Sequence, residues 1–171
     1  MDPPDKPKGE KSMIFKEIYE QYDRDVYRFC LTLTGNADEA EELLQETFYR
    51  AFLSVDRFEG RCTVYTWLCQ IGKNTWLKEC RRRKRFHEKP IDELSLMDKS
   101  PTPEDKSILQ DEYNRVRQAV VRLEEPYRDV FVLHIFGGLS LKEIAQAHNK
   151  SESWARVTYN RAKQKIIMEV S

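Results

Sequence analysis

The sequence has few of the residues that interrupt helices, because its 171 residues include only 6 glycines and 7 prolines. With 34% of its residues charged, this composition is typical of a soluble and mainly helical protein. No apolar run approaches the length that spans a bilayer, and the N-terminal segment MDPPDKPKGEKS lacks the apolar centre of a signal peptide. We therefore expect a cytoplasmic protein that does not insert into a membrane.

The sequence also lacks the clusters of cysteine and histidine that hold metals. Its 4 cysteines form no CxxC pair, and its 3 histidines lie far apart. Zinc sites and disulfide frameworks have closer and more regular spacings. We predict no metal, no cofactor and no disulfide, and we expect reduced, partly buried thiols, as is usual in the cytoplasm. The cysteines are Cys30, Cys62, Cys69 and Cys80.

The formal net charge is zero, so no overall field draws the chain to nucleic acid or to a membrane. The charges are nevertheless segregated along the sequence. Acids dominate from Asp38 to Glu59, bases dominate from Arg61 to Lys89, and bases dominate again from Arg156 to Lys165. Alternating patches of this kind indicate two different partners, one basic and one acidic.

Helical periodicity predicts an all-α fold of two small domains. The first domain has helical spacing from Ile14 to Leu33, a break at Gly35-Asn36, and a helix at Ala37–Val55. Asn36 is a candidate N-cap with Glu39 at the capping-box position. The predicted boundaries are a mobile tail at 1–12, a first helical domain at 13–86, a flexible acidic linker at 87–106 and a second helical domain at 107–171.

The stretch TVYTWLCQIGKNTWLKECRRRKR, residues 63–85, combines an apolar stripe with an arginine-rich end. The pattern alone fits a core helix with a solvated tail, a membrane-surface segment or a helix that binds nucleic acid. Spacings of three and four residues predict that one stripe of its side chains is mostly buried. That stripe consists of Val64, Trp67, Leu68, Ile71 and Thr75. Tyr65 is a candidate for stacking on bases, as is Trp67, although we favour core packing for Trp67.

The second domain contains a candidate helix-turn-helix in the segment GGLSLKEIAQAHNKSESWARVTYNRAKQKI. The helices expected here are Pro103–Arg122, Pro126–Phe136, Ser140–Ala147 and Glu152–Val170. Ser140 and Glu143 form a candidate capping box, and Ser151 or Ser153 is a candidate cap for the last helix. That helix is expected to bury Trp154, Val157 or Thr158, Ala162 and Ile166, and to expose Arg156, Asn160, Arg161 and Lys163. DNA binding is favoured over a plain helical hairpin with a solvated basic face.

Three segments together resemble one family. They are DEAEELLQETFYRAF, DRFEGRCTVYTWLCQIGKNTWLKECRRRKR and LEEPYRDVFVLHIFGGLSLKEIAQ, with a linker before the last. In order and spacing the chain resembles bacterial RNA polymerase sigma factors of the extracytoplasmic-function (ECF) type, which retain only regions two and four. The resemblance runs from about Ile14 to Ile167.

This resemblance implies a transcription initiation factor without a catalytic site. The implied partners are core RNA polymerase, through the clamp helices of its largest catalytic subunit, promoter DNA, and a membrane-linked anti-sigma factor. The implied polymerase contacts are Asp38, Glu39, Glu42, Leu43, Gln45, Glu46 and Phe48. The implied minus-ten contacts are Phe58, Gly60, Arg61, Cys62, Thr63, Lys73, Asn74, Lys78 and Arg81, and the loop and Asn74 are expected to receive a flipped base. The implied minus-thirty-five contacts are Lys142, Ser153, Arg156, Val157, Asn160, Arg161 and Lys163.

Two short segments depart from the usual family pattern. The turn reads His148-Asn149-Lys150 where members often have Leu-Gly-Ile or Leu-Gly-Val, and Ser153-Trp154-Ala155 stands where Gly-Thr-Val is common. The loop before the minus-ten helix carries Arg61-Cys62-Thr63, so neither base preference can be transferred from relatives.

Two other classes of function account for less of the sequence. A two-domain regulator that never touches polymerase explains the second domain alone. A nuclease built on the clustered acids of DEAEELLQE lacks a second ligand or a base group, and its acids are spread around the helix.

Overall fold

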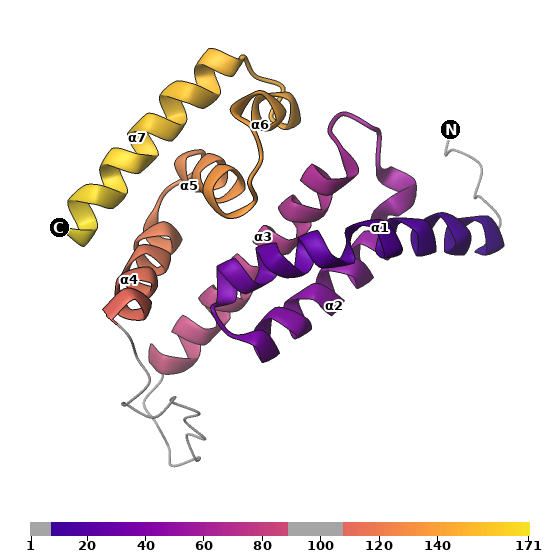
Figure 1. The fold of residues 1–171 in the computed structure, drawn as a ribbon, viewed down its shortest axis with the longest axis horizontal. Helices are drawn as coiled ribbons and strands as arrows, with labels where there is room; N and C mark the ends of the chain where they lie inside the picture. Colours follow the sequence, from indigo (N-terminus) through magenta and orange to yellow (C-terminus); the bar gives the residue numbers. More distant parts are fainter. Residues whose placement is uncertain (1–7, 89–107) are drawn as a thin grey trace, which may run out of the picture.

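The computed structural model describes residues 8–88 and 108–171, and within those ranges every regular element is a helix (Figure 1). The predicted all-α class is therefore confirmed. Four helices lie before the undescribed segment: α1 (Lys8–Thr34), α2 (Ala37–Ser54), the short η1 (Val55–Arg57) and α3 (Val64–Glu88). The helices after it are α4 (Ile108–Arg122), α5 (Tyr127–Phe131), η3 (Val132–Phe136), α6 (Leu141–Ala147) and α7 (Glu152–Val170).

The N-terminal bundle consists of α1, α2 and α3, and each of these helices packs against the other two (Figure 1). Gly35, at φ +69°, and Asn36 make the turn between α1 and α2. The Asn36 side chain accepts the backbone N–H groups of Asp38 and Glu39, which confirms it as the N-cap. Buried apolar side chains from all three helices fill the interior, among them Phe29, Leu33, Phe48 and Leu68.

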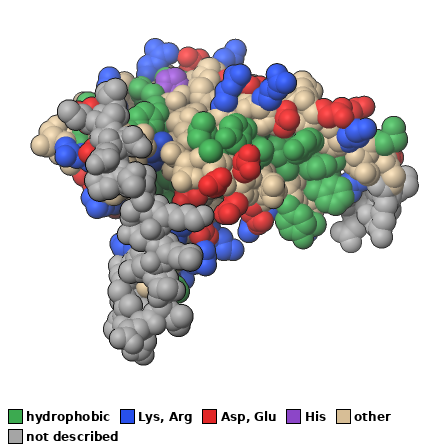
Figure 2. Space-filling view, turned by 60° about the horizontal axis from the view of Figure 1, so that its bottom comes forward, with side chains coloured by type: hydrophobic (Ala, Val, Ile, Leu, Met, Phe, Trp, Pro, Cys, Tyr) green, Lys and Arg blue, Asp and Glu red, His purple; other side chains and the backbone are tan. Residues whose placement is uncertain are grey.

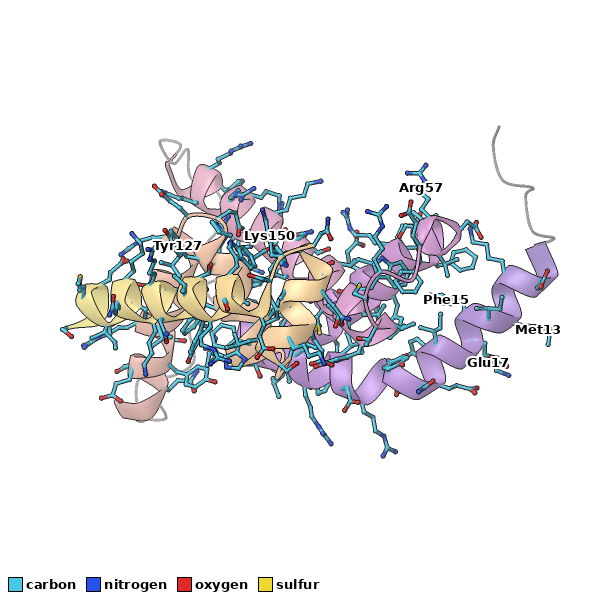
Figure 3. The ribbon with its side chains drawn as sticks, turned by 90° about the horizontal axis from the view of Figure 1, so that it is seen from above. Met13, Phe15, Glu17, Arg57, Tyr127 and Lys150 are labelled. Atoms are coloured by element: carbon cyan, nitrogen blue, oxygen red, sulfur yellow. The ribbon has the colours of Figure 1, made fainter. Side chains whose placement is uncertain are left out.

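The first helix begins earlier than the sequence predicted. Residues 8–12 were expected to belong to a mobile tail, but α1 starts at Lys8, and only residues 1–7 of that tail lie outside the described part. Lys11 accounts for the difference, because its Nζ lies 2.7 Å from Asp56 Oδ2 and 5.1 Å from the centre of the Phe52 ring. Phe15 then points from α1 toward α2, whereas Met13 and Glu17 point away (Figure 3).

The C-terminal bundle contains α4 to α7, with α7 packed along α4, α5 and α6. The helix predicted at Pro126–Phe136 is present as α5 and η3, whose last turn is π-helical. The Ser140 and Glu143 capping box is present in full, and Ser151, not Ser153, caps α7 by accepting the N–H of Trp154. The start of the helix predicted at Pro103 lies outside the described residues, and α4 is described from Ile108.

The apolar members of the predicted stripe of α3 belong to the core or pack against it, but the most buried face of the helix is displaced from this stripe. Of its five members only Leu68 is buried, and the other four are half-buried. The residues of α3 that are buried are Thr66, Leu68, Cys69, Gly72, Lys73, Trp76 and Leu77. The arc is shifted because α3 has neighbours on two sides: α1 and α2 on one, and the C-terminal bundle on the other.

The two bundles pack on each other, so their buried apolar side chains form one cluster. α3 contacts η3 and α6, and α1 contacts η3. The predicted linker, 87–106, lies outside the described residues except for its first two, which belong to α3. Among the described residues, no helix is long and apolar enough to cross a membrane.

Candidate functional surfaces

The predicted polymerase-binding residues lie along α2. Asp38, Glu42 and Gln45 are exposed, and Figure 2 shows a face of the molecule on which acidic and hydrophobic side chains lie next to one another. The exposed apolar side chains on α2 are Tyr49 and Leu53, which are 59% and 57% accessible. The helix therefore offers both negative charge and apolar surface to a partner.

Two of the predicted acids already have partners within the chain. Glu39 Oε1 accepts a bond from Arg83 Nη1 at 3.1 Å, and Glu46 Oε1 accepts one from Arg50 Nε at 2.7 Å. The first bond replaces the other half of the predicted capping box, because the Glu39 carboxylate turns toward α3 and not toward the Asn36 N–H. Glu39 and Glu46 can meet a basic partner only by sharing or exchanging these bonds.

Two predicted apolar contacts lie largely inside the protein. Phe48 is 3% accessible and packs edge-on against Phe15 and Tyr19, so its ring is not available to a partner, which corrects the prediction for this residue. Leu43 is 8% accessible, but it lines a groove between α2 and the end of α3. Amphipathic spacing fixes both positions on the inner face of α2.

That groove has a volume of about 750 Å³, and acids predominate on its α2 wall whereas bases predominate on its α3 wall. Glu39, Glu42 and Glu46 line it from α2. Lys78 and four arginines line it from α3, namely Arg81, Arg82, Arg83 and Arg85. Arg82 and Arg83 both donate to Glu79, and the bond from Arg82 lowers the pKa of that carboxyl. The sequence did not predict that α3 forms the second wall of this groove, or that Phe86, which is 75% accessible, lies beside it. The arginine-rich run of α3 is the feature of the sequence that could have indicated this wall.

The loop before α3 is largely open to solvent. Gly60 has φ +72°, and a Cβ added at this position would meet no atom within 4 Å. Arg61 is paired with Glu59 at 2.7 Å, and the ring of the half-buried Phe58 lies 4.9 Å from that of Trp67, centre to centre.

The end of this loop is held in place by contacts with α3. The Thr63 hydroxyl accepts the N–H of Thr66 at 3.1 Å and so caps α3. Cys62 is half-buried, and burial raises the pKa of its thiol. The loop therefore presents Gly60 and Arg61 to solvent, whereas Thr63 is held by the helix that follows.

One face of α3 carries most of the other minus-ten candidates. Thr63, Asn74 and Arg81 follow one another at helical spacing on this face, together with Trp67, Gln70 and Lys78, and Asn74, Lys78 and Arg81 are exposed. Asn74 lies about 16 Å along the axis from Thr63, at about 1.5 Å per residue. The loop reaches back along α3, because the Phe58 ring packs on Trp67, which lies two helical turns before Asn74. That the loop and Asn74 together receive one flipped base stays a prediction.

Lys73 is not on that face. It is 3% accessible and its Nζ forms an ion pair with Asp129 Oδ1 of the C-terminal bundle. Burial lowers the pKa of Lys73 to about 8, and the nearby Glu125 opposes this shift. Lys73 can therefore contact DNA only when the C-terminal bundle is displaced. Tyr65 also has a structural partner, because its hydroxyl donates to the Gly137 carbonyl at 2.8 Å.

The predicted minus-thirty-five residues lie on α6 and α7, one on the first and six on the second. All seven are exposed, including Lys142 on α6. The opposite face of α7 is buried through Ala155, Thr158, Ala162 and Ile166, and Trp154 is half-buried. Thr158 is thus the inward residue of the two alternatives, and Val157 is 48% accessible. Arg156 Nη2 donates to Glu152 Oε1 at 3.1 Å, which holds the guanidinium near the start of the helix.

The unusual turn between α6 and α7 is held by polar contacts. Asn149 adopts φ +54°, in the left-handed region that Asn tolerates well. His148 Nδ1 lies 3.0 Å from the Ile144 carbonyl, and Nε2 lies 2.9 Å from Asp129 Oδ2. Burial lowers the pKa of His148. The departure from the usual turn therefore leaves the helix-turn-helix intact.

Comparison with known families agrees with this geometry. The profile described as Sigma-70 region 2 matches residues 18–86, and that described as Sigma-70, region 4 matches residues 113–166. The chain belongs to the ECF-type sigma factors. This ECF sigma factor is therefore a transcription initiation factor that binds core RNA polymerase and promoter DNA, and the N- and C-terminal bundles contain its regions 2 and 4.

The sigma factor is similar to curated relatives along most of its length. It is 26% identical to the ECF RNA polymerase sigma factor SigW of Bacillus subtilis, over 93% of this chain and 89% of the relative. It is 29% identical to the ECF RNA polymerase sigma factor SigM of the same organism, over 90% of this chain and 93% of the relative. The fold also resembles a solved structure, that of the sigma factor RpoE in complex with the anti-sigma factor NepR from Bartonella quintana. The TM-score is 0.55 at 22% identity, with 89% of this chain and 93% of that chain covered.

The cysteines and acids of the sigma factor form no metal-binding cluster in the described ranges. Among residues 8–88 and 108–171, no group of three or more His, Cys, Asp or Glu side chains is arranged to hold a metal ion. The four cysteines are free thiols in the structure. Burial raises the pKa of Cys30 and of Cys69 to about 12, so both are protonated.

Proposed function

We propose that this sigma factor divides initiation among three surfaces on separate helices. The acidic face of α2 binds the clamp helices of the largest polymerase subunit. The exposed face of α3, with the loop before it, binds the minus-ten element, and α7 reads the minus-thirty-five element. The observation that carries this proposal is the separation of charge: acids predominate among the exposed charges of α2, whereas bases predominate among those of α3 and α7.

Binding to polymerase would use Asp38 and Glu42 as the main charged contacts. They are exposed, whereas Glu39 and Glu46 first have to exchange their arginine partners. Complementary charge accelerates encounter and sets register more than it raises affinity. We assign the apolar part of the contact to Tyr49 and Leu53, in place of the buried Phe48.

Binding to the minus-ten element would use the exposed face of α3 as a track for single-stranded DNA. Lys78 and Arg81 supply positive charge. One base leaves the stack and is received by Asn74 and by the loop formed by Phe58, Gly60, Arg61, Cys62 and Thr63. Flipping a base costs a few kcal/mol of stacking, which such contacts offset.

Binding to the minus-thirty-five element would place the N-terminal part of α7 in the major groove. Arg156 and Asn160 lie one turn apart, so they reach neighbouring base edges, and Val157 between them offers an apolar contact. We assign phosphate contacts to Arg161, Lys163 and Lys142, and we place Ser153 close to the DNA backbone.

The chain itself would perform no covalent chemistry and would need no cofactor. We propose that it acts in the cytoplasm and is held inactive by a membrane-linked anti-sigma factor. The complex of RpoE with an anti-sigma factor, to which this fold is similar, supports such control. The exposed apolar and acidic face of α2 is the surface for which an inhibitor and polymerase would compete.

Run-off transcription tests the assignment. Purified core polymerase from the source organism is mixed with the sigma factor and a library of its own promoter fragments. We expect specific transcripts that depend on the sigma factor. Binding of DNA without any transcript would favour a regulator that does not use polymerase, and cleavage of the template would favour a nuclease. Either result would overturn the proposal.

A further inference from the structure

The contact between the two bundles is polar at three points. Tyr65 Oη of α3 donates to the Gly137 carbonyl at 2.8 Å. Arg117 Nε of α4 donates to the Thr32 carbonyl near the end of α1 at 2.9 Å. The third point is the ion pair between Lys73 of α3 and Asp129 of α5. We call the arrangement that these contacts hold the closed state.

One carboxylate in this contact connects both DNA-binding elements. Asp129 Oδ1 meets Lys73 on the minus-ten helix, and Asp129 Oδ2 lies 2.9 Å from His148 Nε2 in the turn of the helix-turn-helix. The side chains are well shielded from water, with accessible fractions of 4% for Lys73 and 18% each for Asp129 and His148. Removing one member of a shielded ion pair is costly, because the other charge is left uncompensated.

The closed state cannot engage a whole promoter. The minus-ten and minus-thirty-five elements differ by about 25 base pairs in position, which is about 85 Å of B-form DNA at about 3.4 Å per base pair. In the closed state α6 and η3 touch α3 directly, and the 19-residue α7 is only about 28 Å long. The two bundles must therefore separate before both elements are bound.

We propose that the free sigma factor inhibits itself through this contact, with Asp129 occupying Lys73 in place of a DNA phosphate. The inference rests on the proposed function, because it assigns promoter binding to both bundles. The reading face of α7 stays exposed in the closed state. Self-inhibition therefore acts on the simultaneous use of the two elements and on Lys73. Polymerase shifts the chain to the open state, because it binds that state more tightly.

Asp129→Asn tests the proposal in the full-length protein, with Asp111→Asn as the control. Both changes remove one negative charge from the C-terminal bundle, but Asp111 is an exposed residue of α4 outside the closed contact. Small-angle X-ray scattering measures the radius of gyration, which is about 16 Å for a compact chain of this length. We expect Asp129→Asn to be more extended than the wild type and the control. Its affinity for core polymerase should rise about fivefold or more, because apparent affinity scales with the fraction in the open state.

A second variant keeps the test decisive if Asp129→Asn weakens the C-terminal bundle. Tyr65→Phe removes only the bond to Gly137 and leaves Asp129 and His148 in place, and it should also extend the chain. The double variant Lys73→Asp, Asp129→Lys should restore the compact radius of gyration that either change alone increases. This variant is tested by scattering only. Folded Asp129→Asn and Tyr65→Phe proteins with wild-type radius and polymerase affinity would overturn self-inhibition. Extension without polymerase binding by any protein, wild type included, would instead overturn the proposed function.

Discussion

His148 Nε2 lies 2.9 Å from Asp129 Oδ2, and this pair ties the turn of the helix-turn-helix to α5. The imidazole also lies against Trp154, with 5.4 Å between ring centres. Many relatives of this type place an apolar residue at the same point of the turn. In this chain, a hydrogen bond from one nitrogen of the neutral imidazole and an aromatic contact replace part of that apolar packing. The stability of region 4 consequently depends on the protonation of one histidine.

We predict that acidification below pH 6.5 weakens region 4 through His148. Burial lowers the pKa of His148 from its ordinary value of 6.5. The unfolded chain then binds the proton more readily than the folded one, so stability is fully present above pH 6.5 and declines as the pH falls toward the folded pKa. Thermal unfolding between pH 7.5 and 5 measures this. The wild type should lose more stability over that range than His148→Gln, and parallel curves for the two would contradict the prediction.

We predict that Ser140→Ala destabilises region 4 by about 1 kcal/mol, because it removes the N-cap of α6. Ser140 accepts the N–H of Glu143 at 3.1 Å, and the Glu143 carboxylate accepts the Ser140 N–H at 2.8 Å. Ser153→Ala is the matched control, since Ser153 is exposed and does not cap α7; it should change stability by less than about 0.5 kcal/mol. Chemical denaturation of the full chain compares the two. Equal losses would show that the cap is unimportant.

Alanine substitutions at two glycines distinguish the cost of backbone strain from the cost of disturbing the contact between the bundles. Gly35 and Gly60 have φ of +69° and +72°, so alanine at either is strained by about 1–2 kcal/mol. A Cβ on Gly35 would lie 2.4 Å from Arg117 Nη1, whereas a Cβ on Gly60 meets nothing within 4 Å. Gly35→Ala should therefore cost more stability than Gly60→Ala. In an Arg117→Ala background the two costs should become equal, and a persistent difference would contradict this account.

Local signals in the sequence were sufficient for the N-cap residues of three helices. Asn36, Ser140 and Ser151 cap the next helix through bonds to residues two or three positions away, so their neighbours in the sequence determine the structure. The two faces of α7 were likewise predictable, because helical spacing separates Ala162 and Ile166 from Arg156 and Asn160.

Contacts between distant residues were not predictable in this way. Lys73 was expected to belong to a basic track, but its position depends on Asp129, which lies in the other bundle. Glu39 matched a capping box, yet Arg83 competes for its carboxylate from 44 positions away. The buried arc of α3 is displaced for the same reason. A periodic pattern in the sequence predicts which face of a helix is buried only when neighbouring elements pack on one side of that helix.

We predict that Asp38→Lys and Glu42→Lys weaken binding to core polymerase by about tenfold or more each, because they place positive charge against a basic partner. Binding of the same proteins to a minus-thirty-five duplex should be unchanged. Glu17→Lys, an exposed reversal on α1, is the control and should leave both affinities near the wild type. Fluorescence anisotropy measures the two affinities. Equal losses of polymerase and duplex binding would refute the assignment of α2 to polymerase.

The last prediction separates base contacts from phosphate contacts on α7. Asn160→Ala removes a group that we place at a base edge, so it should cost about 1–3 kcal/mol on the preferred duplex and much less on an unrelated one. Lys163→Ala removes a phosphate contact and should weaken binding to both duplexes alike. It should also reduce the slope of log K against log salt by about 0.9, because one fewer counterion is released. Salt titrations with a duplex selected from the promoter library measure both effects. If Lys163→Ala changed sequence preference and Asn160→Ala changed only the salt slope, the two assignments would be exchanged, and α7 would lie in the groove with a different face toward the bases.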